Sequence, residues 1–509
     1  MNPTKFIENI QVEFLRDKSS EERKILGQYL TGSIIADYMS SQIHVQKDIF
    51  GNKAFRIIDA GAGAGILSAA AAVRCLAIGI KNVHVVCFEL DKKAVSFLEK
   101  TMALVADYFT KKKSKFSYEI ICDDFVLSRP DKDFAQKFDL SVINPPYFKY
   151  NVSDSPYSQA TKDLFKGNPN IYASFMAIVL ACLRPNGQMI AIVPRSFTNG
   201  LYFHGFRDYL LGNSNLNFIH VFKKRNEVFK NVDVLQENII CSFIKEAQSK
   251  YISISSSESS NDLENRKTSK YRASLIIDRS NHHNIIRIPE TEEEFEIMKI
   301  AELLPSNFAD AGYFISTGPV VEHRTHQYLS DKPSKGKTVP LIRAHNFNGM
   351  SVHWTGENQK DLSFNLNQGF EKHLLSNKIY VVLKRITSKD EHKRLVANVY
   401  QPDKKNEFIG FTNKINYLGV IGENLTLEEA YGLTAFLNST FMDKYFRCIS
   451  GNTQVNATEV RLFKFPNRNT ITKLGTRILK LNALKQEQID VIVNAIINKL
   501  KPSYEGKSR

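Results

Sequence analysis

From about residue 20 to residue 245, short apolar runs alternate with amphipathic stretches. This alternation is typical of βαβ units, in which helices connect the parallel strands of one sheet. Strands are expected in RIIDAGAG, NVHVVCFEL, SYEIICDDF, FDLSVINPP and GQMIAIVP, and helices in ILSAAAAVRCLAIGI and NIYASFMAIVLACLRPNG. Because ligands gather outside the carboxyl ends of the strands in open α/β sheets, the chemistry is expected where these apolar runs end.

The rest of the chain has a different character, which predicts more than one domain. A length of 509 residues exceeds what one hydrophobic core usually supports. We expect an α/β domain over residues 1–245, a Ser-rich and charged connecting segment with possible edge strands over 246–300, and a mixed α/β domain over 301–509. In the last of these, helical patterns return at LEEAYGLTAFLNSTFMDKYFRCI and QEQIDVIVNAIINKL.

The composition favours a soluble protein that acts on a polyanion. Lys and Arg number 68 against 53 Asp and Glu, and the resulting net charge of +15 favours phosphate contacts with a nucleic acid. No apolar run is long enough to span a membrane, and the first residues lack a secretion signal. Six cysteines lie far apart, without a CxxC pair or a His at metal-ligand spacing. We therefore expect a cytoplasmic protein with buried thiols, without a metal site and without a membrane partner.

A cluster of small residues, DAGAGAG, follows the first apolar run and begins at Asp59. Gly61, Ala62 and Gly63 would let the backbone approach a ligand closely, as in the Gly-rich turns of nucleotide-binding folds. A tight turn between a strand and a helix also needs one or two glycines. The glycine cluster alone therefore does not identify a ligand.

Acidic side chains stand at the ends of the next two runs. Glu89, followed by Leu90, could accept hydrogen bonds from ribose hydroxyls. Asp124 could accept one from an adenine amino group, while Phe125 flanks the purine face. A single acid at such a place is usually a solvated turn residue. Together with the glycine cluster, the two acids favour a nucleotide-like cofactor.

The fourth run ends in Asn144-Pro145-Pro146-Tyr147, where two prolines restrict the backbone and stiffen the loop. The lone pair of an aromatic amino group is delocalised into its ring. An Asn carboxamide oxygen and a backbone carbonyl could accept the amino hydrogens and free this lone pair for methyl transfer. The Tyr147 ring could stack on a base that has left the duplex. At an arbitrary position, the same residues would form a surface loop.

In this order, DAGAGAG, FEL and DDF resemble the cofactor motifs of Rossmann-like, class I methyltransferases. The resemblance implies S-adenosyl-L-methionine as the cofactor. GQYLT resembles the extra cofactor motif of the gamma class of amino-methylating DNA methyltransferases, which implies that Thr31 holds the methionine end of the cofactor. The residues that the resemblance implies in cofactor binding are Thr31, Asp59, Gly61, Ala62, Gly63, Glu89, Leu90, Asp124 and Phe125.

NPPY resembles the catalytic motif of adenine-N6 methyltransferases, whereas cytosine-N4 enzymes more often have Ser at its first position. The resemblance implies that Asn144, Pro145, Pro146 and Tyr147 are the catalytic residues. It also implies that Phe229 packs against the flipped base from the side opposite Tyr147. A Phe before a polar turn and an apolar strand is, however, more often a core residue.

Along most of its length the chain resembles type II modification methylases with a TaqI-like catalytic domain, and most of all the group of the BsuBI and PstI adenine methylases. KRITSKDEHKRL and SGNTQVNAT carry the closer resemblance. It implies adenine-N6 methylation of double-stranded DNA within CTGCAG, which protects the site from a cognate restriction endonuclease. Residues 1–245 would then be the methyltransferase domain and residues 301–509 the target-recognition domain. We expect a monomer, with the endonuclease as a functional partner.

Site-specific methylation requires phosphate contacts for register and base-edge contacts for discrimination. The second domain contains residues of suitable types, and amide side chains can pair with adenine through two hydrogen bonds. The candidates for DNA binding are Arg343, Lys384, Arg385, Asn452, Gln454 and Asn456. Helix capping and turn chemistry explain the amide-rich segment nearly as well, and any one basic run could be a solvated face.

Other functions compete with DNA methylation. A nicotinamide-dependent dehydrogenase would use the glycine cluster and Glu89, but it gives no role to NPPY. An RNA or protein-glutamine methyltransferase is a stronger alternative, because NPPY can orient any planar amino or amide nitrogen. A non-catalytic DNA-binding protein with the same fold would not need Asn144, Glu89 and Asp124.

Overall fold

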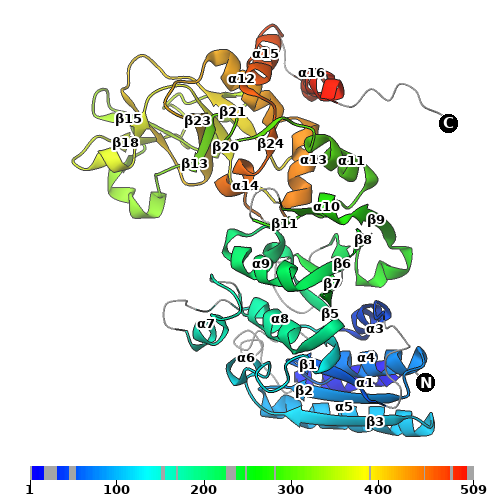
Figure 1. Cartoon of the computed structure of the whole chain (residues 1–509). Coiled ribbons are helices and arrows are strands. Elements are labelled where there is room, and N and C mark those ends of the chain that lie inside the picture. Colours follow the sequence, from blue (N-terminus) through cyan, green and yellow to red (C-terminus); the bar gives the residue numbers. More distant parts are fainter. Residues whose placement is uncertain are drawn as a thin grey trace, which may run out of the picture. The chain divides into compact units, whose positions relative to one another are not determined.

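The computed structural model describes residues 3–16, 31–44, 53–148, 150, 155–167, 170–224, 237–246, 249–279, 283–388, 391–451, 453–481 and 485–500. The chain divides into two compact units, Met1–Glu290 and Thr291–Arg509 (Figure 1). The segment 246–300, expected to connect two domains, is therefore shared between the two units. Its first part adds two strands to the sheet of the first unit, and its last part begins the second unit.

The first unit is built on a nine-stranded sheet with the order β3-β2-β1-β4-β5-β7-β6-β8-β9. The β1 strand pairs in parallel with β2 and β4, and β7 runs antiparallel between β5 and β6. This arrangement confirms the predicted α/β fold with a mixed, mainly parallel sheet. The strands are β1 (Phe55–Ala60), β2 (Asn82–Phe88), β3 (Lys115–Ile121), β4 (Phe138–Ile143), β5 (Leu183–Pro194), β6 (Ser214–Phe222), β7 (Asn238–Lys245), β8 (Tyr251–Ser257) and β9 (Lys267–Arg272).

Helices connect these strands and pack on the sheet. The longest described helix, α5, begins where the Asp91 side chain accepts a hydrogen bond from the Lys93 N–H, a standard N-cap. The helices described in this unit are α1 (Pro3–Arg16), α3 (Ser33–Ser41), α4 (Ile66–Ala77), α5 (Lys92–Lys111), α6 (Phe125–Ser128), α7 (Pro156–Thr161), α8 (Ile171–Cys182), α9 (His204–Asn213) and α10 (Ala273–Ile276). The short strands β10 (Ile277–Asp278) and β11 (Ile285–Ile286) form a separate ribbon.

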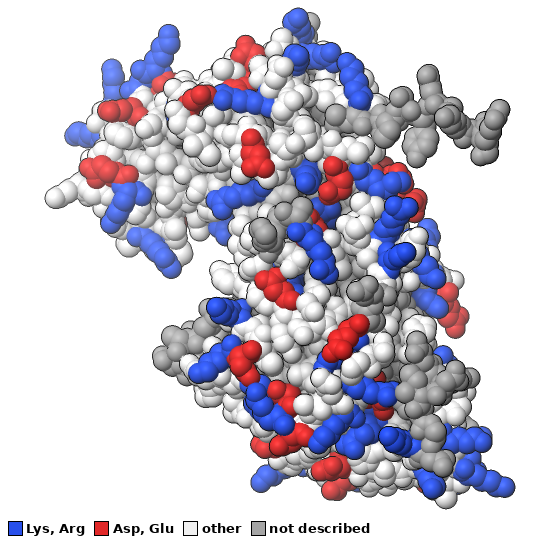
Figure 2. Space-filling view, viewed as in Figure 1, with Lys and Arg blue, Asp and Glu red and all other residues white. Residues whose placement is uncertain are grey.

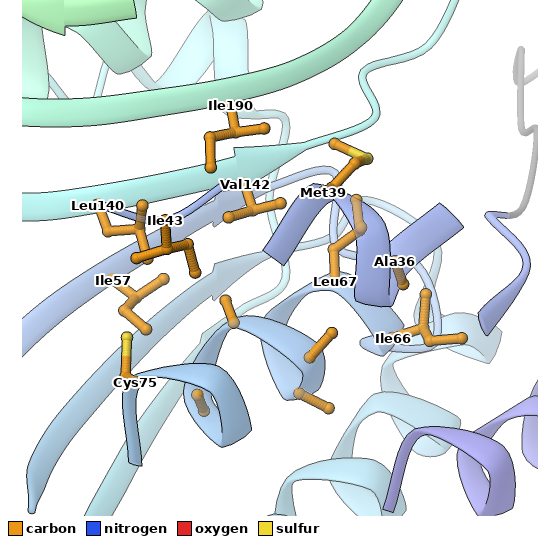
Figure 3. Close-up of a cluster of buried hydrophobic side chains, with 14 of the residues drawn as sticks. Ala36, Met39, Ile43, Ile57, Ile66, Leu67, Cys75, Leu140, Val142 and Ile190 are labelled. Atoms are coloured by element: carbon orange, nitrogen blue, oxygen red, sulfur yellow. The ribbon is translucent and has the colours of Figure 1, made fainter. Parts of the chain in front are cut away.

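The core of the first unit follows the two-residue period of its strands. Ile57 of β1 points toward α3 and α4, together with Leu140 and Val142 of β4 and Ile190 of β5 (Figure 3). Ile58, the next residue along β1, is equally buried but lies outside this cluster. The α8 helix, buried along nearly its whole length, contacts β1 and β5. Helices thus fix the strand ends that carry the predicted motifs.

The second unit contains two main sheets, with the orders β13-β23-β20-β21-β17-β16 and β14-β18-β15-β22-β19. Its strands are β12 (Ser306–Asn307), β13 (Tyr313–Thr317), β14 (Leu329–Ser330), β15 (Thr338–Ile342), β16 (Phe347–Asn348), β17 (Ser351–Val352), β18 (Leu362–Asn365), β19 (Leu375–Ser376), β20 (Tyr380–Lys384), β21 (Ala397–Tyr400), β22 (Phe408–Phe411), β23 (Ile415–Val420) and β24 (Lys464–Phe465). Its helices are α11 (Glu292–Ala301), α12 (Leu427–Leu437), α13 (Thr440–Ile449), α14 (Ala457–Arg461), α15 (Arg468–Ile478) and α16 (Gln486–Ile497).

One expectation about the cysteines is wrong. Cys122 is exposed, whereas the other five cysteines are buried, because Cys122 follows β3 at the open edge of the sheet. Within the described residues, no helix is both long enough and apolar enough to cross a membrane.

Gly65, at the N-terminus of α4, lets the glycine cluster pass close to α5. Its φ of +88° lies in the left-handed region, and a Cβ atom there would stand 2.6 Å from Leu98 Cδ1 and 3.2 Å from Thr101 Cγ2. Leu98 and Thr101 are fully buried. A side chain at this position would therefore force Leu98 and its buried neighbours on α5 to shift.

We predict that Gly65→Ala destabilises the protein more than Gly79→Ala does. Gly79 has a similar φ of +99°, but a Cβ atom there would have nothing within 4 Å, so this position isolates the backbone cost. That shared cost is about 1 kcal/mol, and overpacking against Leu98 adds about 1–3 kcal/mol at Gly65 alone. Urea denaturation of the two variants measures the difference. Equal losses of unfolding free energy would contradict the close packing described for Gly65.

Candidate active site

The glycine cluster is closed onto the end of β2 by three hydrogen bonds, two accepted by a backbone carbonyl and one by a side chain. The N–H groups of Gly61 and Ala62 both donate to the Phe88 carbonyl oxygen, each at 2.9 Å. The Gly63 N–H donates to Glu89 Oε2 at 2.7 Å. Because β1 and β2 pair in parallel, these groups meet at the carboxyl ends of both strands. The turn is therefore held open toward that edge of the sheet.

Both carboxylate oxygens of Glu89 accept backbone hydrogen bonds. Its Oε1 atom accepts from the Asp91 N–H at 2.9 Å, and its Oε2 atom accepts from Gly63. A carboxylate that follows the second strand of such a sheet is placed to accept hydrogen bonds from vicinal hydroxyls, such as those of a ribose.

Asp59, the last polar residue of β1, is a carboxyl group buried to 1% exposure. Its Oδ2 atom accepts a hydrogen bond from the Ser68 hydroxyl of α4, and no described residue makes a hydrogen bond to its Oδ1 atom. Burial raises the pKa of Asp59 to about 7, and the negative charge of Glu89 acts in the same direction. Two acidic groups thus stand together beneath the glycine cluster.

Asp124 and Phe125, which follow β3, both make contacts that stabilise the fold. Asp124 caps α6, since its Oδ1 atom accepts from the N–H groups of Val126 and Leu127, at 2.9 and 3.0 Å. Its Oδ2 atom accepts from the Tyr157 hydroxyl at 2.9 Å. Phe125 is buried, with its ring 5.2 Å from that of Phe88 and 5.1 Å from that of Phe175.

Leu90 differs from these neighbours because it is 53% exposed, which is unusual for a leucine at the end of a buried strand. It lies directly after Glu89, at the edge where the glycine cluster opens. An apolar side chain in this place can cover the face of a planar ring.

Asn144 and Tyr147 are joined to each other and to the chain before the glycine cluster. The Asn144 Nδ2 group donates to Thr31 Oγ1 at 3.0 Å, which fixes the orientation of the carboxamide. The Tyr147 hydroxyl lies 2.6 Å from Asn144 Oδ1 and 2.8 Å from the Ile192 carbonyl oxygen. Thr31 is buried, so this contact is shielded from water. The structure therefore brings Thr31, Asn144 and Tyr147 together.

The NPPY loop and the glycine cluster are neighbours, as the order of β1 and β4 requires. A Cβ atom at Gly61 would stand 3.9 Å from Pro146 Cδ and 3.5 Å from Phe175 Cε1. Pro145 is buried beside them and Pro146 is half-buried. A ligand held by the glycine cluster would consequently lie next to the loop that carries Asn144.

Sequence reasoning missed Tyr157, the residue of α7 that donates to Asp124. The two residues are 33 positions apart, and no spacing rule connects them. The α7 region is also held by ion pairs, since Arg129 contacts Asp163 at 2.6 Å and Asp131 at 2.7 Å. The only signal in the sequence is Pro156, which is favoured at the first position of a helix.

The DNA-binding candidates of the second unit have different surroundings. Arg343 pairs with Glu322 at 3.2 Å, and Lys384 pairs with Glu391 at 2.8 Å. Arg385 Nη2 lies 3.4 Å from Gln454 Oε1, so these two candidates meet. The backbone N–H of Asn456 donates to Glu459 at the start of α14. Phe229 and Asn452 lie outside the described residues.

Basic side chains are spread over the face of the molecule seen in Figure 2. Lys and Arg lie over the visible parts of both units, with Asp and Glu among them. On this face, the charges form no single basic patch.

The family model and the two relatives compared with this chain are all methyltransferases. The model of the Eco57I restriction-modification methylase family matches residues 77–229. The type II methyltransferase M.PstI of Providencia stuartii is 33% identical over 498 residues, which cover 96% of each chain. The type II methyltransferase M.BsuBI of Bacillus subtilis is 34% identical, over 91% of this chain and 92% of its own.

A solved structure shares the fold over nearly the whole chain. The type IIL restriction-modification enzyme MmeI, solved in complex with DNA, matches with a TM-score of 0.53 and 11% identity. The match covers 99% of this chain and 75% of the MmeI chain.

We predict that the unfolding free energy of the wild type falls as the pH rises from 5 to 8. Asp59→Asn should abolish this fall. The folded pKa of about 7 lies above the ordinary value of 3.8, so ionisation between these values favours the unfolded chain. The wild-type unfolding free energy should fall relative to Asp59→Asn by up to about 3 kcal/mol between pH 5 and pH 8, since one pKa unit corresponds to about 1.4 kcal/mol.

Denaturant titrations at both pH values measure this difference. Asp107→Asn, at an exposed position of α5, is the matched control and should follow the wild type. The same pH dependence in the wild type and in Asp59→Asn would contradict the burial argument.

Proposed function

Because the chain belongs to the type II methyltransferases of restriction-modification systems, we propose that it methylates the N6 atom of an adenine flipped out of a short duplex DNA site. S-adenosyl-L-methionine is the proposed methyl donor. The observation that carries the proposal is the position of Asn144 and Tyr147 beside the glycine cluster. An acceptor for an amino group thus lies next to a turn suited to a nucleoside.

The residues at the ends of β1 and β2 fit this cofactor. Glu89 is the carboxylate at the end of β2, where it suits the ribose hydroxyls, and Leu90 is exposed beside it for the adenine ring. The acidic pair of Asp59 and Glu89 suits a cofactor that carries positive charge. When bound, S-adenosyl-L-methionine supplies a methyl group activated by its sulfonium.

The remaining proposed contacts are placed around the same turn. Asp124 Oδ2 has one acceptor position besides the Tyr157 bond, which suits the amino group of the cofactor adenine. Phe125 supports that side of the turn from the core. Thr31 links the cofactor end of the site to Asn144.

The chain's contribution to catalysis is to hold the target nitrogen. Thr31 fixes the Asn144 carboxamide so that Oδ1 is the acceptor atom of the loop. The Tyr147 hydroxyl reaches both Asn144 Oδ1 and the Ile192 carbonyl oxygen. It can therefore donate to Ile192 when an adenine amino hydrogen takes its place at Asn144. This acceptor draws the nitrogen lone pair out of conjugation with the ring.

The reaction also releases one amino hydrogen as a proton. Asn144 is a neutral amide and too weak a base to keep this proton, which consequently leaves to water. The Pro145-Pro146 pair keeps the loop rigid, so that little reorganisation is needed when the base arrives. Tyr147 is proposed to stack on the flipped base, and Phe229 to contact its other side.

The target site is a further part of the proposal. The relationship to the PstI and BsuBI methyltransferases supports CTGCAG as the sequence, with a cognate restriction endonuclease as the functional partner. The second unit is proposed to recognise this site in double-stranded DNA, and the protein is proposed to act in the cytoplasm as a monomer.

We predict that expression in a methylation-free host places N6-methyladenine in one short motif of the genome. Asn144→Ala should lower the methylation rate by at least about 10²-fold, the usual cost of losing a transition-state hydrogen bond. The affinity of the purified variant for S-adenosyl-L-methionine should stay within about twofold of wild type, because Asn144 acts on the target. Long-read sequencing and mass spectrometry of nucleosides provide the measurement. Soluble wild-type protein with an unmodified genome, or with N4-methylcytosine instead, would contradict the proposal.

We predict that Glu89→Gln weakens cofactor binding by about 10- to 150-fold, because a hydrogen bond to a charged group is worth about 1.5–3 kcal/mol. Isothermal titration calorimetry with S-adenosyl-L-methionine measures the change. Glu99→Gln, on the exposed face of α5, is the matched control and should bind as the wild type does. An unchanged dissociation constant in Glu89→Gln would argue against the proposed ribose contact.

A further inference from the structure

Two segments of the second unit, residues 385–387 and 453–455, form a short antiparallel ribbon. The Thr387 N–H donates to the Thr453 carbonyl oxygen at 3.1 Å, and the Val455 N–H donates to the Arg385 carbonyl oxygen at 2.7 Å. Ile386 and Gln454 face each other as the bridge pair between these bonds. The ribbon therefore joins two segments that lie almost seventy residues apart in the sequence.

The ribbon has buried ends and an exposed middle pair. Thr387 and Val455 are fully buried, whereas Ile386 is 49% exposed and Gln454 is exposed, as is Thr453. Side chains of a directly opposed pair project from the same face of a ribbon, within contact distance of each other. An isoleucine and a glutamine thus stand together on the outer face.

A buried arginine braces one segment of the ribbon and the chain just before the other. The Arg394 side chain is fully buried, donates from Nε to the Thr387 hydroxyl at 3.1 Å and from Nη1 to the Ser450 carbonyl oxygen at 3.2 Å. Its own backbone N–H donates to Asp443 of α13. The position of the outer face is therefore fixed before any ligand binds.

Arg385 lies beside Gln454 and favours one orientation of its carboxamide. Its Nη1 group donates to the Asn413 carbonyl oxygen at 2.9 Å, and its Nη2 group points to Gln454 Oε1 at 3.4 Å. The carboxamide oxygen has a second lone pair, and the amide nitrogen has two hydrogens. Gln454 is thereby set to accept through Oε1 and to donate through Nε2.

We propose that this ribbon enters the DNA major groove and that Gln454 and Ile386 together read one A·T pair. Gln454 would bond the adenine N6 and N7 atoms, and Ile386 would contact the thymine methyl group. The major groove admits a two-stranded ribbon, and these are the groups that an A·T pair presents there. Arg385 acts as a positioning residue for Gln454. The inference rests on the proposed function of DNA methylation, and it narrows that function to a specificity-determining pair.

Other basic candidates in the unit are less suited to base reading. Lys384 pairs with Glu391, and Arg343 pairs with Glu322. Lys414, which is 52% exposed and follows the Asn413 contact of Arg385, also pairs with Glu322, at 3.4 Å. Because this one carboxylate faces two cations, a positive charge is left over beside the ribbon for a phosphate contact. The ribbon thus combines base-reading groups with a neighbouring positive charge.

The first test is the sequence preference of Gln454→Ala in the methylation-free host. We expect methylation to spread to sites that differ from the wild-type motif at one A·T position, with discrimination at that pair reduced by about 5- to 150-fold. Arg385→Ala should relax the same pair. Gln401→Ala and Ile421→Ala are the matched controls, because both residues are exposed and Gln401 follows β21 at the end opposite Arg385.

The second test uses modified duplexes and measures binding by the purified full chain. Replacing the thymine of the identified pair by deoxyuridine should weaken the wild type about fourfold, the value of one buried methyl group, and leave Ile386→Ala unaffected. Replacing the paired adenine by 7-deazaadenine should weaken the wild type and leave Gln454→Ala unaffected. These losses, specific to one side chain and one base atom, would not arise from unfolding.

The results separate this inference from the proposed function. A wild-type protein that methylates no DNA overturns the function itself. A wild-type protein that methylates one motif, with Gln454→Ala and Ile386→Ala keeping the same motif and the same response to both modified bases, overturns the ribbon alone. Relaxation of different base pairs by Arg385→Ala and Gln454→Ala would overturn the positioning role of Arg385.

Discussion

The parallel pairing of β1 between β2 and β4 is the constraint on which the site depends. It brings three carboxyl ends to one edge of the sheet, and with them the glycine cluster, Glu89 and the loop of Asn144. The hydrogen bonds from Gly61 and Gly63 to the end of β2 then hold the turn against its neighbours. The close packing of Gly65 on α5 stabilises the other end of the same turn. A nucleoside cofactor and a target nitrogen would thereby meet at one place.

Much of this arrangement could be predicted from the sequence, because strong apolar periodicity and strand-end motifs are local signals. The five expected strands of the first unit correspond to β1–β5, and the α/β fold is confirmed. The contact between Thr31 and Asn144 depends on residues 113 positions apart, and no local pattern encodes it. The same holds for Tyr157 and Asp124. The single helical run near residue 440 is instead two helices, since Ser439 caps the second one.

In both units, buried residues hold polar side chains in a fixed position. In the first, the buried Thr31 holds the Asn144 carboxamide, and the buried Asp59 lies beneath the glycine cluster. In the second, Arg394 braces two distant segments from within the core. Both devices fix polar side chains before a ligand arrives, which lowers the cost of ordering them on binding. The residue types at these places can be read from the sequence. The partners that orient them are known only from the structure.

Fluorescence of 2-aminopurine tests the central claim most directly. We expect a CTGCAG duplex with 2-aminopurine in place of the target adenine to become several times brighter when the protein binds, because the base leaves the stack. A duplex with 2-aminopurine at a flanking position should stay dark. Tight binding to CTGCAG without any increase at the target position would contradict the claim that the Asn144 loop acts on a flipped adenine.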